Sequence, residues 1–125
     1  MKILIIDAAN DKIVFSIITE KQSYTTSHVN CRENFDKFIN FLLIFLKENK
    51  IKMDDIERIY VNQGPGKFSS LRISISIAKA ISLAKNINLF GFETKFLKNS
   101  NYKKLLELDR KNLLTNNLIK PLYSS

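Results

Sequence analysis

The sequence has few of the residues on which several classes of protein depend. Its 125 residues include one cysteine, one histidine, three glycines, two prolines and no tryptophan. Because Cys31 has no second cysteine to pair with, an internal disulfide is excluded, and we expect a protein of the reducing cytoplasm. Metal centres built from histidine or cysteine need several such ligands, and His28 is alone. We therefore expect no metal site and interpret His28 as a surface residue of an edge strand.

Long hydrophobic runs are also absent. The most apolar segment, residues 35–46, is interrupted by three polar side chains and is shorter than the roughly 20 residues that a membrane span needs. The apolar run at residues 3–6 is closed by Asp7, so no signal peptide is expected there. With 45% hydrophobic and 26% charged residues, the composition is typical of a soluble globular domain.

Acidic residues are outnumbered 12 to 20 by lysine and arginine, which gives a net charge of +8. Half of this excess lies in residues 93–125, where seven residues are basic and three acidic. A basic RNA-binding module is therefore one alternative for the function. No stacking ladder or recognition motif accompanies the charge, so we favour a solvated face.

Short apolar runs rich in β-branched residues predict five strands, at residues 2–7, 13–19, 23–29, 56–62 and 88–92. Helices are predicted at residues 33–50 and 69–86. At the start of the second segment, apolar and polar residues alternate with period two, as in a strand. Its length without a turn signal favours a helix nonetheless.

The resulting order β-β-β-α-β-α-β predicts an α/β domain with a mixed five-stranded sheet. Short turns join the first three strands into an antiparallel meander with the third at an edge, and the helical crossover places the fourth strand parallel to the first. We assign this domain to residues 1–95. Residues 96–125 are predicted to form a short helical tail with an extended end.

The predicted helix at residues 33–50 has a wide apolar face. Its apolar side chains cover an arc of roughly 200°, about twice the width that packing on a sheet requires. The second helix carries small side chains that would let another helix approach closely. We therefore predict an exposed apolar strip that binds a partner or a second copy of the chain. The residues of this predicted strip are Phe38, Phe41, Leu42, Phe45, Ser74, Ile77, Ala78 and Ile81.

A glycine-containing turn, residues 64–66, joins the fourth strand to the second helix. If Gly64 or Gly66 adopts a positive φ there, replacement by valine should strain the backbone. Ser69 is the predicted N-cap of this helix, with a hydrophobic staple between Phe68 and Ile73. The residues assigned to this structural loop, which we call the glycine elbow, are Gly64, Pro65, Gly66, Phe68, Ser69 and Arg72.

The alternative for the elbow is a phosphate-binding loop at the helix N-terminus. A Walker A loop needs glycine where Val61 stands and Ser or Thr where Phe68 stands, and a dinucleotide fingerprint needs glycine at Ser69. We therefore favour a structural elbow. Asp7, at the end of the first strand, is the best candidate for residual chemistry, although a role in capping the turn is at least as well supported.

Three stretches resemble the TsaB (YeaZ) family of proteins with an actin-like ATPase fold. They are Gly-Pro-Gly-Lys-Phe-Ser-Ser-Leu-Arg-Ile at 64–73, Ile-Leu-Ile-Ile-Asp at 3–7 and Pro-Leu-Tyr at 121–123. The resemblance covers about residues 1–95 and implies a single actin-like (ribonuclease H-like) lobe without most of the second lobe. The chain departs from the family at Lys67, Ser69, Ser70, Ser74 and Ala8-Ala9, which removes hydroxyls and glycines that nucleotide-binding relatives use around phosphates.

The resemblance implies a non-catalytic subunit, without a cofactor of its own, that pairs with the enzyme TsaD to support threonylcarbamoylation of adenosine in tRNA. TsaD and TsaE would supply the ATP chemistry, and contact with tRNA would be indirect. In this family the helix pair packs against the matching pair of TsaD as a four-helix bundle, and without TsaD we expect a homodimer. A standalone actin-like enzyme that binds ATP is the remaining alternative, which the short chain disfavours.

Overall fold

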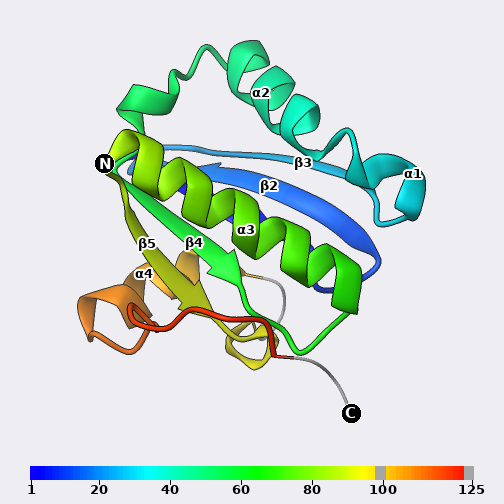
Figure 1. Ribbon diagram of the computed structural model, residues 1–125. Coiled ribbons are helices and arrows are strands. Elements are labelled where there is room, and N and C mark those ends of the chain that lie inside the picture. The colour runs from blue at the N-terminus through cyan, green and yellow to red at the C-terminus, as the bar shows by residue number, and fades with distance from the viewer. Residues whose placement is uncertain (98–100, 123–125) are drawn as a thin grey trace.

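A five-stranded mixed sheet forms the centre of the protein (Figure 1). The structure is a computed structural model that describes residues 1–97 and 101–122. The strands lie side by side in the order β3-β2-β1-β4-β5, and the elements follow one another as β-β-β-α-β-α-β, as predicted. The strands are β1 (Ile3–Asp7), β2 (Lys12–Ile18), β3 (Ser23–Val29), β4 (Arg58–Asn62) and β5 (Asn88–Phe92).

The most apolar strand lies in the middle of this sheet. β1 pairs antiparallel with β2, where Ile3 lies opposite Ile18, and parallel with β4, where Ile3 lies opposite Arg58. All five residues of β1 are buried, as expected for a strand covered on both faces. β3 forms one edge, and there the ring of His28 stacks on Phe41 with 3.8 Å between ring centroids. The predictions of a parallel fourth strand and of His28 on an edge strand are confirmed.

Two helices, α2 (Phe38–Glu48) and α3 (Phe68–Lys85), cover one face of the sheet (Figure 1). The prediction of one helix over residues 33–50 is wrong, because a short helix, α1 (Arg32–Phe35), is separated from α2 by a turn. In this turn the Lys37 N–H donates to the carbonyl of Asn34 at 3.2 Å. Beyond it, Phe38 packs edge-on against Phe15 in the core, with 5.2 Å between ring centroids. This core contact is the physical reason for the break.

The start of α3 also differs from the prediction. Its N-cap is Lys67, with extended backbone and no side-chain cap hydrogen bond, so Ser69 is not the N-cap. The predicted staple is wrong as well, because Phe68 is the first helical residue and is 54% exposed. The buried hydroxyl in this turn belongs to Ser70, which donates to the carbonyl of Ala8 at 2.7 Å. Contacts with the β1–β2 turn, rather than a local cap, therefore fix where the helix begins.

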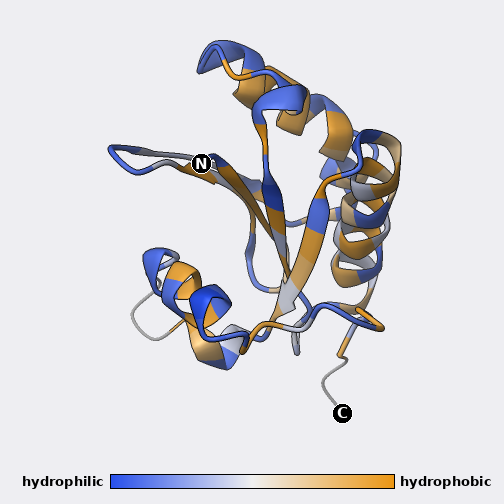
Figure 2. Cartoon of the chain, turned by 90° about the vertical axis from the view of Figure 1, so that its left-hand side faces the viewer, coloured by the Kyte–Doolittle hydropathy of each residue, from blue (hydrophilic) through white to orange (hydrophobic). Residues whose placement is uncertain are grey.

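The tail covers the opposite face of the sheet (Figure 2). Leu105 of α4 (Lys103–Arg110) and Leu114 pack with Ile3, Ile5 and Tyr60 in a second apolar cluster. The chain then runs back beside β5, and the predicted extended end reaches Leu122 before Tyr123, which lies outside the described residues. No helix of the described part of the chain is long and apolar enough to cross a membrane. Two short 3-10 helices complete the structure: η1 (Met53–Asp55) and η2 (Thr94–Phe96).

Candidate functional site

The glycine elbow is held tightly against its neighbours. Gly64 has a positive φ of +105°, and a β-carbon placed there would lie 2.5 Å from the carbonyl oxygen of Leu122. A β-carbon on Gly66 would collide with the backbone carbonyl of Ala9. Two backbone segments therefore approach the turn too closely for any side chain at these two positions.

The polar groups beneath the elbow bind one another. Asn62 is fully buried, and its side-chain oxygen accepts a hydrogen bond from the Gly64 N–H at 2.8 Å. On the other side of the elbow, the amide nitrogen of Asn30 donates to the carbonyl of Ala8 at 3.0 Å and to the hydroxyl of Ser70 at 3.0 Å. These bonds join the elbow to the β1–β2 turn and to the end of β3. They favour the structural interpretation of the elbow over a phosphate cradle.

Asp7 is enclosed by three donors. Its Oδ1 accepts hydrogen bonds from the side-chain amide of Asn62 at 2.9 Å and from the Ala9 N–H at 3.3 Å, and its Oδ2 accepts one from the Tyr102 hydroxyl at 2.7 Å. Only 5% of the residue is exposed. Burial and the adjacent Asp7 charge raise the pKa of Tyr102 well above its usual range, so the hydroxyl stays a donor. Asp7 thus caps its turn and also anchors the tail.

The remaining predicted elbow residues face outward. Pro65, Ser69 and Arg72 are exposed, and the Arg72 guanidinium lies 5.4 Å from the ring centroid of Phe68. Among residues 1–97 and 101–122, no three histidine, cysteine, aspartate or glutamate side chains gather as metal ligands.

The predicted apolar strip is mostly core. The structure buries five of its eight residues and leaves three half-buried, so the prediction that all eight form one exposed strip is wrong. The reason is that the 200° arc of α2 points its centre at the sheet. The buried five are Phe38, Leu42, Phe45, Ser74 and Ala78, and the half-buried three are Phe41, Ile77 and Ile81.

The outward side of α2 is apolar nonetheless. Ile39, Leu43 and Ile44 are 52%, 51% and 53% exposed, and among the exposed residues of the segment 39–44 only Asn40 is polar. We call Ile39, Leu43 and Ile44 the outer face of α2. The predicted arc included Ile39 and Leu43 but not Ile44, and it was not divided into core-facing and outward residues. A helical wheel centred on Phe38 and Leu42 would have found them.

Fold and site together define a single actin-like (ribonuclease H-like) lobe whose fourth strand ends in a structural glycine elbow. A family model described as TsaD, tRNA N6-adenosine threonylcarbamoyltransferase, matches residues 25–94, more than half of the chain. YeaZ from Pseudomonas aeruginosa has the same fold, with a TM-score of 0.69 and 17% identity over 74% of this chain and 43% of that one.

Two curated relatives carry the name tRNA threonylcarbamoyladenosine biosynthesis protein TsaB. The one from Buchnera aphidicola subsp. Schizaphis graminum (strain Sg) is 36% identical over 93 residues, which are 74% of this chain and 44% of that protein. The one from Buchnera aphidicola subsp. Baizongia pistaciae (strain Bp) is 29% identical over 86 residues, 68% and 38% of the two chains. The chain belongs to the TsaB (YeaZ) family, as its motifs predicted, and spans less than half the length of these relatives.

Proposed function

We propose that this protein is a non-catalytic subunit that binds a TsaD-type transferase and thereby supports threonylcarbamoyl transfer to adenosine of tRNA. Family membership supports a role in this tRNA modification, since the curated relatives are named for tRNA threonylcarbamoyladenosine biosynthesis. The closed surroundings of Asp7 support the non-catalytic role, because three donors already occupy the carboxylate at the end of β1.

The outer face of α2 is the observation that carries the proposed pairing. Its three apolar side chains are each about half exposed and lie on consecutive turns of one helix. Exposed apolar patches of this kind mark interaction sites, and a helix with such a face pairs well with another helix. The half-buried Phe41, Ile77 and Ile81 of the predicted strip would border the same interface.

A charge placed on this face tests the proposal. Leu43→Lys and Ile44→Lys each put an ammonium group where a partner helix would pack, and we expect each to weaken binding to the TsaD-type protein of the same organism by at least about tenfold. Calorimetry measures the affinity, and far-UV circular dichroism checks that the fold is intact.

Leu118→Lys is the matched control. Leu118 is 81% exposed and lies in the C-terminal segment, so the same substitution there should leave the affinity within about twofold of the original. If the two α2 variants bind the TsaD-type protein as tightly as the unchanged chain, the interface lies elsewhere. If the unchanged chain shows no binding at all, the proposed function itself fails.

A further inference from the structure

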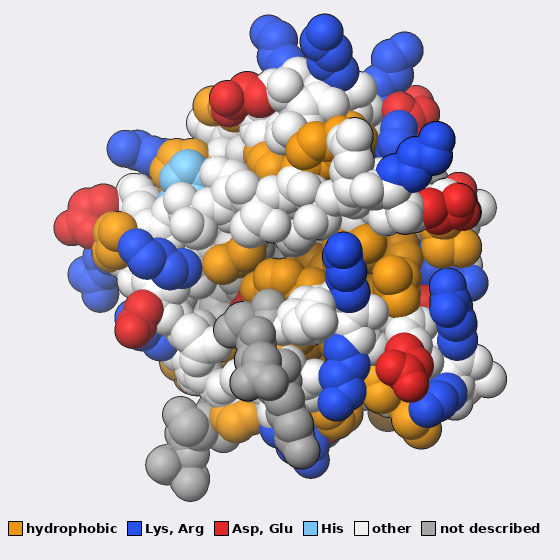
Figure 3. Space-filling model, turned by 180° about the vertical axis from the view of Figure 1, so that it is seen from behind, with side chains coloured by type: hydrophobic (Ala, Val, Ile, Leu, Met, Phe, Trp, Pro, Cys, Tyr) orange, Lys and Arg blue, Asp and Glu red, His pale blue; other side chains and the backbone are white. Residues whose placement is uncertain are grey.

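A groove on the second face of the sheet plays no part in the features described above. It lies between α4 and the ends of the strands remote from the elbow, with a volume of about 770 Å³, a size typical of small-molecule sites. Seen from behind, apolar side chains gather in this hollow, and lysine and arginine side chains lie around it together with some acidic ones (Figure 3). Because α2 and α3 lie on the other face, an inference about the groove does not rest on the proposed function.

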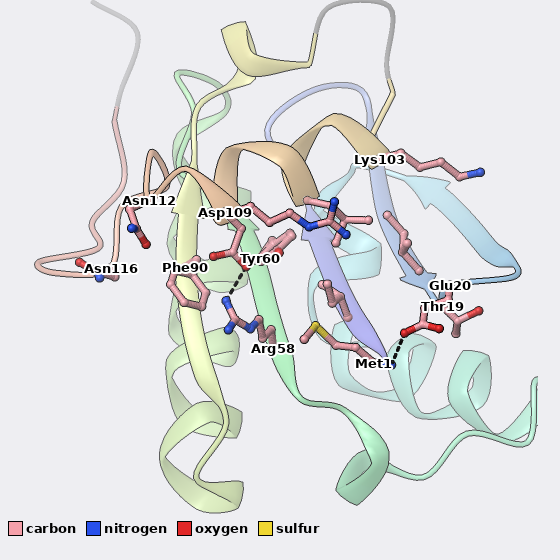
Figure 4. A pocket seen from close by; sticks show the side chains of 14 residues that line it. Met1, Thr19, Glu20, Arg58, Tyr60, Phe90, Lys103, Asp109, Asn112 and Asn116 are labelled. Atoms are coloured by element: carbon pink, nitrogen blue, oxygen red, sulfur yellow. Dashed lines mark hydrogen bonds and ion pairs between the residues drawn. The ribbon is translucent and has the colours of Figure 1, made fainter.

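The floor of the groove is aromatic and electrically balanced. Tyr60 and Phe90 pack edge-on with 6.0 Å between ring centroids, and the Arg58 guanidinium lies 5.2 Å from the centroid of Phe90 (Figure 4). One oxygen of Asp109 accepts hydrogen bonds from Arg58 at 2.6 Å and from the Tyr60 hydroxyl at 2.5 Å. Arg58 and Asp109 neutralise each other, so the floor carries no net charge. Because Tyr60 is fully buried, the flat surface of the floor comes from Phe90 and from the Arg58 guanidinium that lies over its ring.

The rim of the groove carries excess positive charge. Lys103 and Arg110 are exposed and line the groove, and within the described part of the chain neither has an ion-pair partner. They are seven residues apart on α4, which places them on one side of the helix about 10 Å apart, with Leu106 between them. The one other carboxylate among the lining residues, that of Glu20, faces the amino group of Met1 at 3.8 Å. The groove therefore selects for an anion.

We propose that this groove binds a nucleoside phosphate, either as a free nucleotide or as one nucleotide of a single-stranded RNA. Lys103 and Arg110 would contact the phosphate, and the base would cover the flat surface that Phe90 and Arg58 provide. The side-chain amides of Asn112 and Asn116 also line the groove and supply donors and acceptors for the base edge. An acidic peptide matches the charge of the rim but has no planar body to cover the floor.

Titration of the ¹⁵N-labelled protein followed by NMR tests this proposal. The probes are adenosine monophosphate, adenosine, inorganic phosphate, a short single-stranded oligoadenylate and an oligoglutamate peptide. We expect the monophosphate or the oligoadenylate to shift the amide signals of Arg58, Phe90 and α4, and adenosine and inorganic phosphate alone to bind at least about tenfold more weakly. Tighter binding of the oligoadenylate identifies RNA as the source, and tighter binding of the monophosphate identifies a free nucleotide.

The chain offers a closely matched pair of double variants. Lys103→Gln with Arg110→Gln removes the two rim cations and should weaken binding by at least about tenfold. Lys104→Gln with Lys111→Gln removes two positive charges at the same spacing, from α4 and its C-cap, where Lys111 is paired with Glu107 at 3.2 Å. Neither lysine lines the groove, so affinity should stay within about twofold. If the two double variants lose affinity equally, binding depends only on the net charge of the protein, and the proposal is overturned. So would preferential binding of the oligoglutamate peptide or an absence of shifts at the groove.

Discussion

The contact between Tyr102 and Asp7 should stabilise the fold strongly, and Tyr102→Phe removes it with little change in shape. The Tyr102 hydroxyl is the one donor to Oδ2 of Asp7 within the described residues, and Asp7 is 5% exposed. Removing a hydrogen bond to a buried charged group costs about 1.5–3 kcal/mol, because the carboxylate oxygen loses its partner without regaining water. For 125 residues, with an unfolding entropy of about 2.1 cal/mol/K per residue, a loss of 2 kcal/mol corresponds to a decrease in Tm of about 8 °C.

Urea denaturation followed by circular dichroism measures this loss. Tyr24→Phe is the control, since Tyr24 lies on the edge strand and its hydroxyl bonds to Gln22 at the surface, and it should change the free energy of unfolding by less than about 0.5 kcal/mol. A double-mutant cycle with Asp7→Asn isolates the pair and should give a coupling of at least about 1 kcal/mol. If Tyr102→Phe is as stable as the original chain, the tail is not anchored through Asp7 and our account of the site is wrong.

Three further predictions concern alkaline pH, the elbow and ATP. Because burial and a neighbouring carboxylate raise the pKa of Tyr102 and of Tyr60, the folded chain keeps protons that the unfolded chain loses near pH 10. The free energy of unfolding should therefore fall above pH 10, by up to about 1.4 kcal/mol per pH unit for each tyrosine, and the fall should be shallower in Tyr102→Phe; parallel curves would contradict this. Gly64→Ala should lower the free energy of unfolding by about 1–3 kcal/mol in urea denaturation, because φ is +105° and the new β-carbon would collide with Leu122. A loss of ligand affinity with stability intact would favour the phosphate cradle instead. Mg-ATP should not bind tightly at the Asp7 end of the sheet, because the Asp7 carboxylate is already bonded and Ala8 has no hydroxyl. A complex with a low micromolar Kd that shifts the NMR signals of Asp7 and Gly64, rather than those of the groove beside α4, would refute the non-catalytic role.

The sheet was predictable because its strands are short β-branched runs bounded by turns. The helix at α3 was predictable in spite of its period-two start, since eighteen residues without a turn signal are too many for one strand. The turn between α1 and α2 was not predictable in this way, because it contains neither glycine nor proline and arises from the packing of Phe38 against Phe15. A wide apolar arc likewise does not reveal its centre, which is why the buried Leu42 and the exposed Leu43 were not told apart.

Only some of the residues in the hydrogen-bonded site around Asp7 could be predicted from the sequence. Asp7 ends a strand and the glycines follow one, so both attract notice. Tyr102 is 95 residues from Asp7, and no local pattern marks it as a partner. Asn62 carried a weak signal, since a polar residue directly after a buried apolar run must bond to something inside. The tertiary structure determines which groups such residues bind, and a single sequence does not identify partners that are distant along the chain.

The bond between Asp7 and Tyr102 also relates the two surfaces that we propose for binding. Tyr102 directly precedes α4, so its anchor at the end of β1 fixes the start of the helix that carries Lys103 and Arg110. The outer face of α2 has no contact with this anchor, because the sheet lies between them. On the two proposals, the protein partner and the nucleotide therefore occupy opposite faces of one sheet and do not compete for space. The tail thus does more than cover an apolar face, since it places a positively charged rim on the side of the molecule that faces away from the partner.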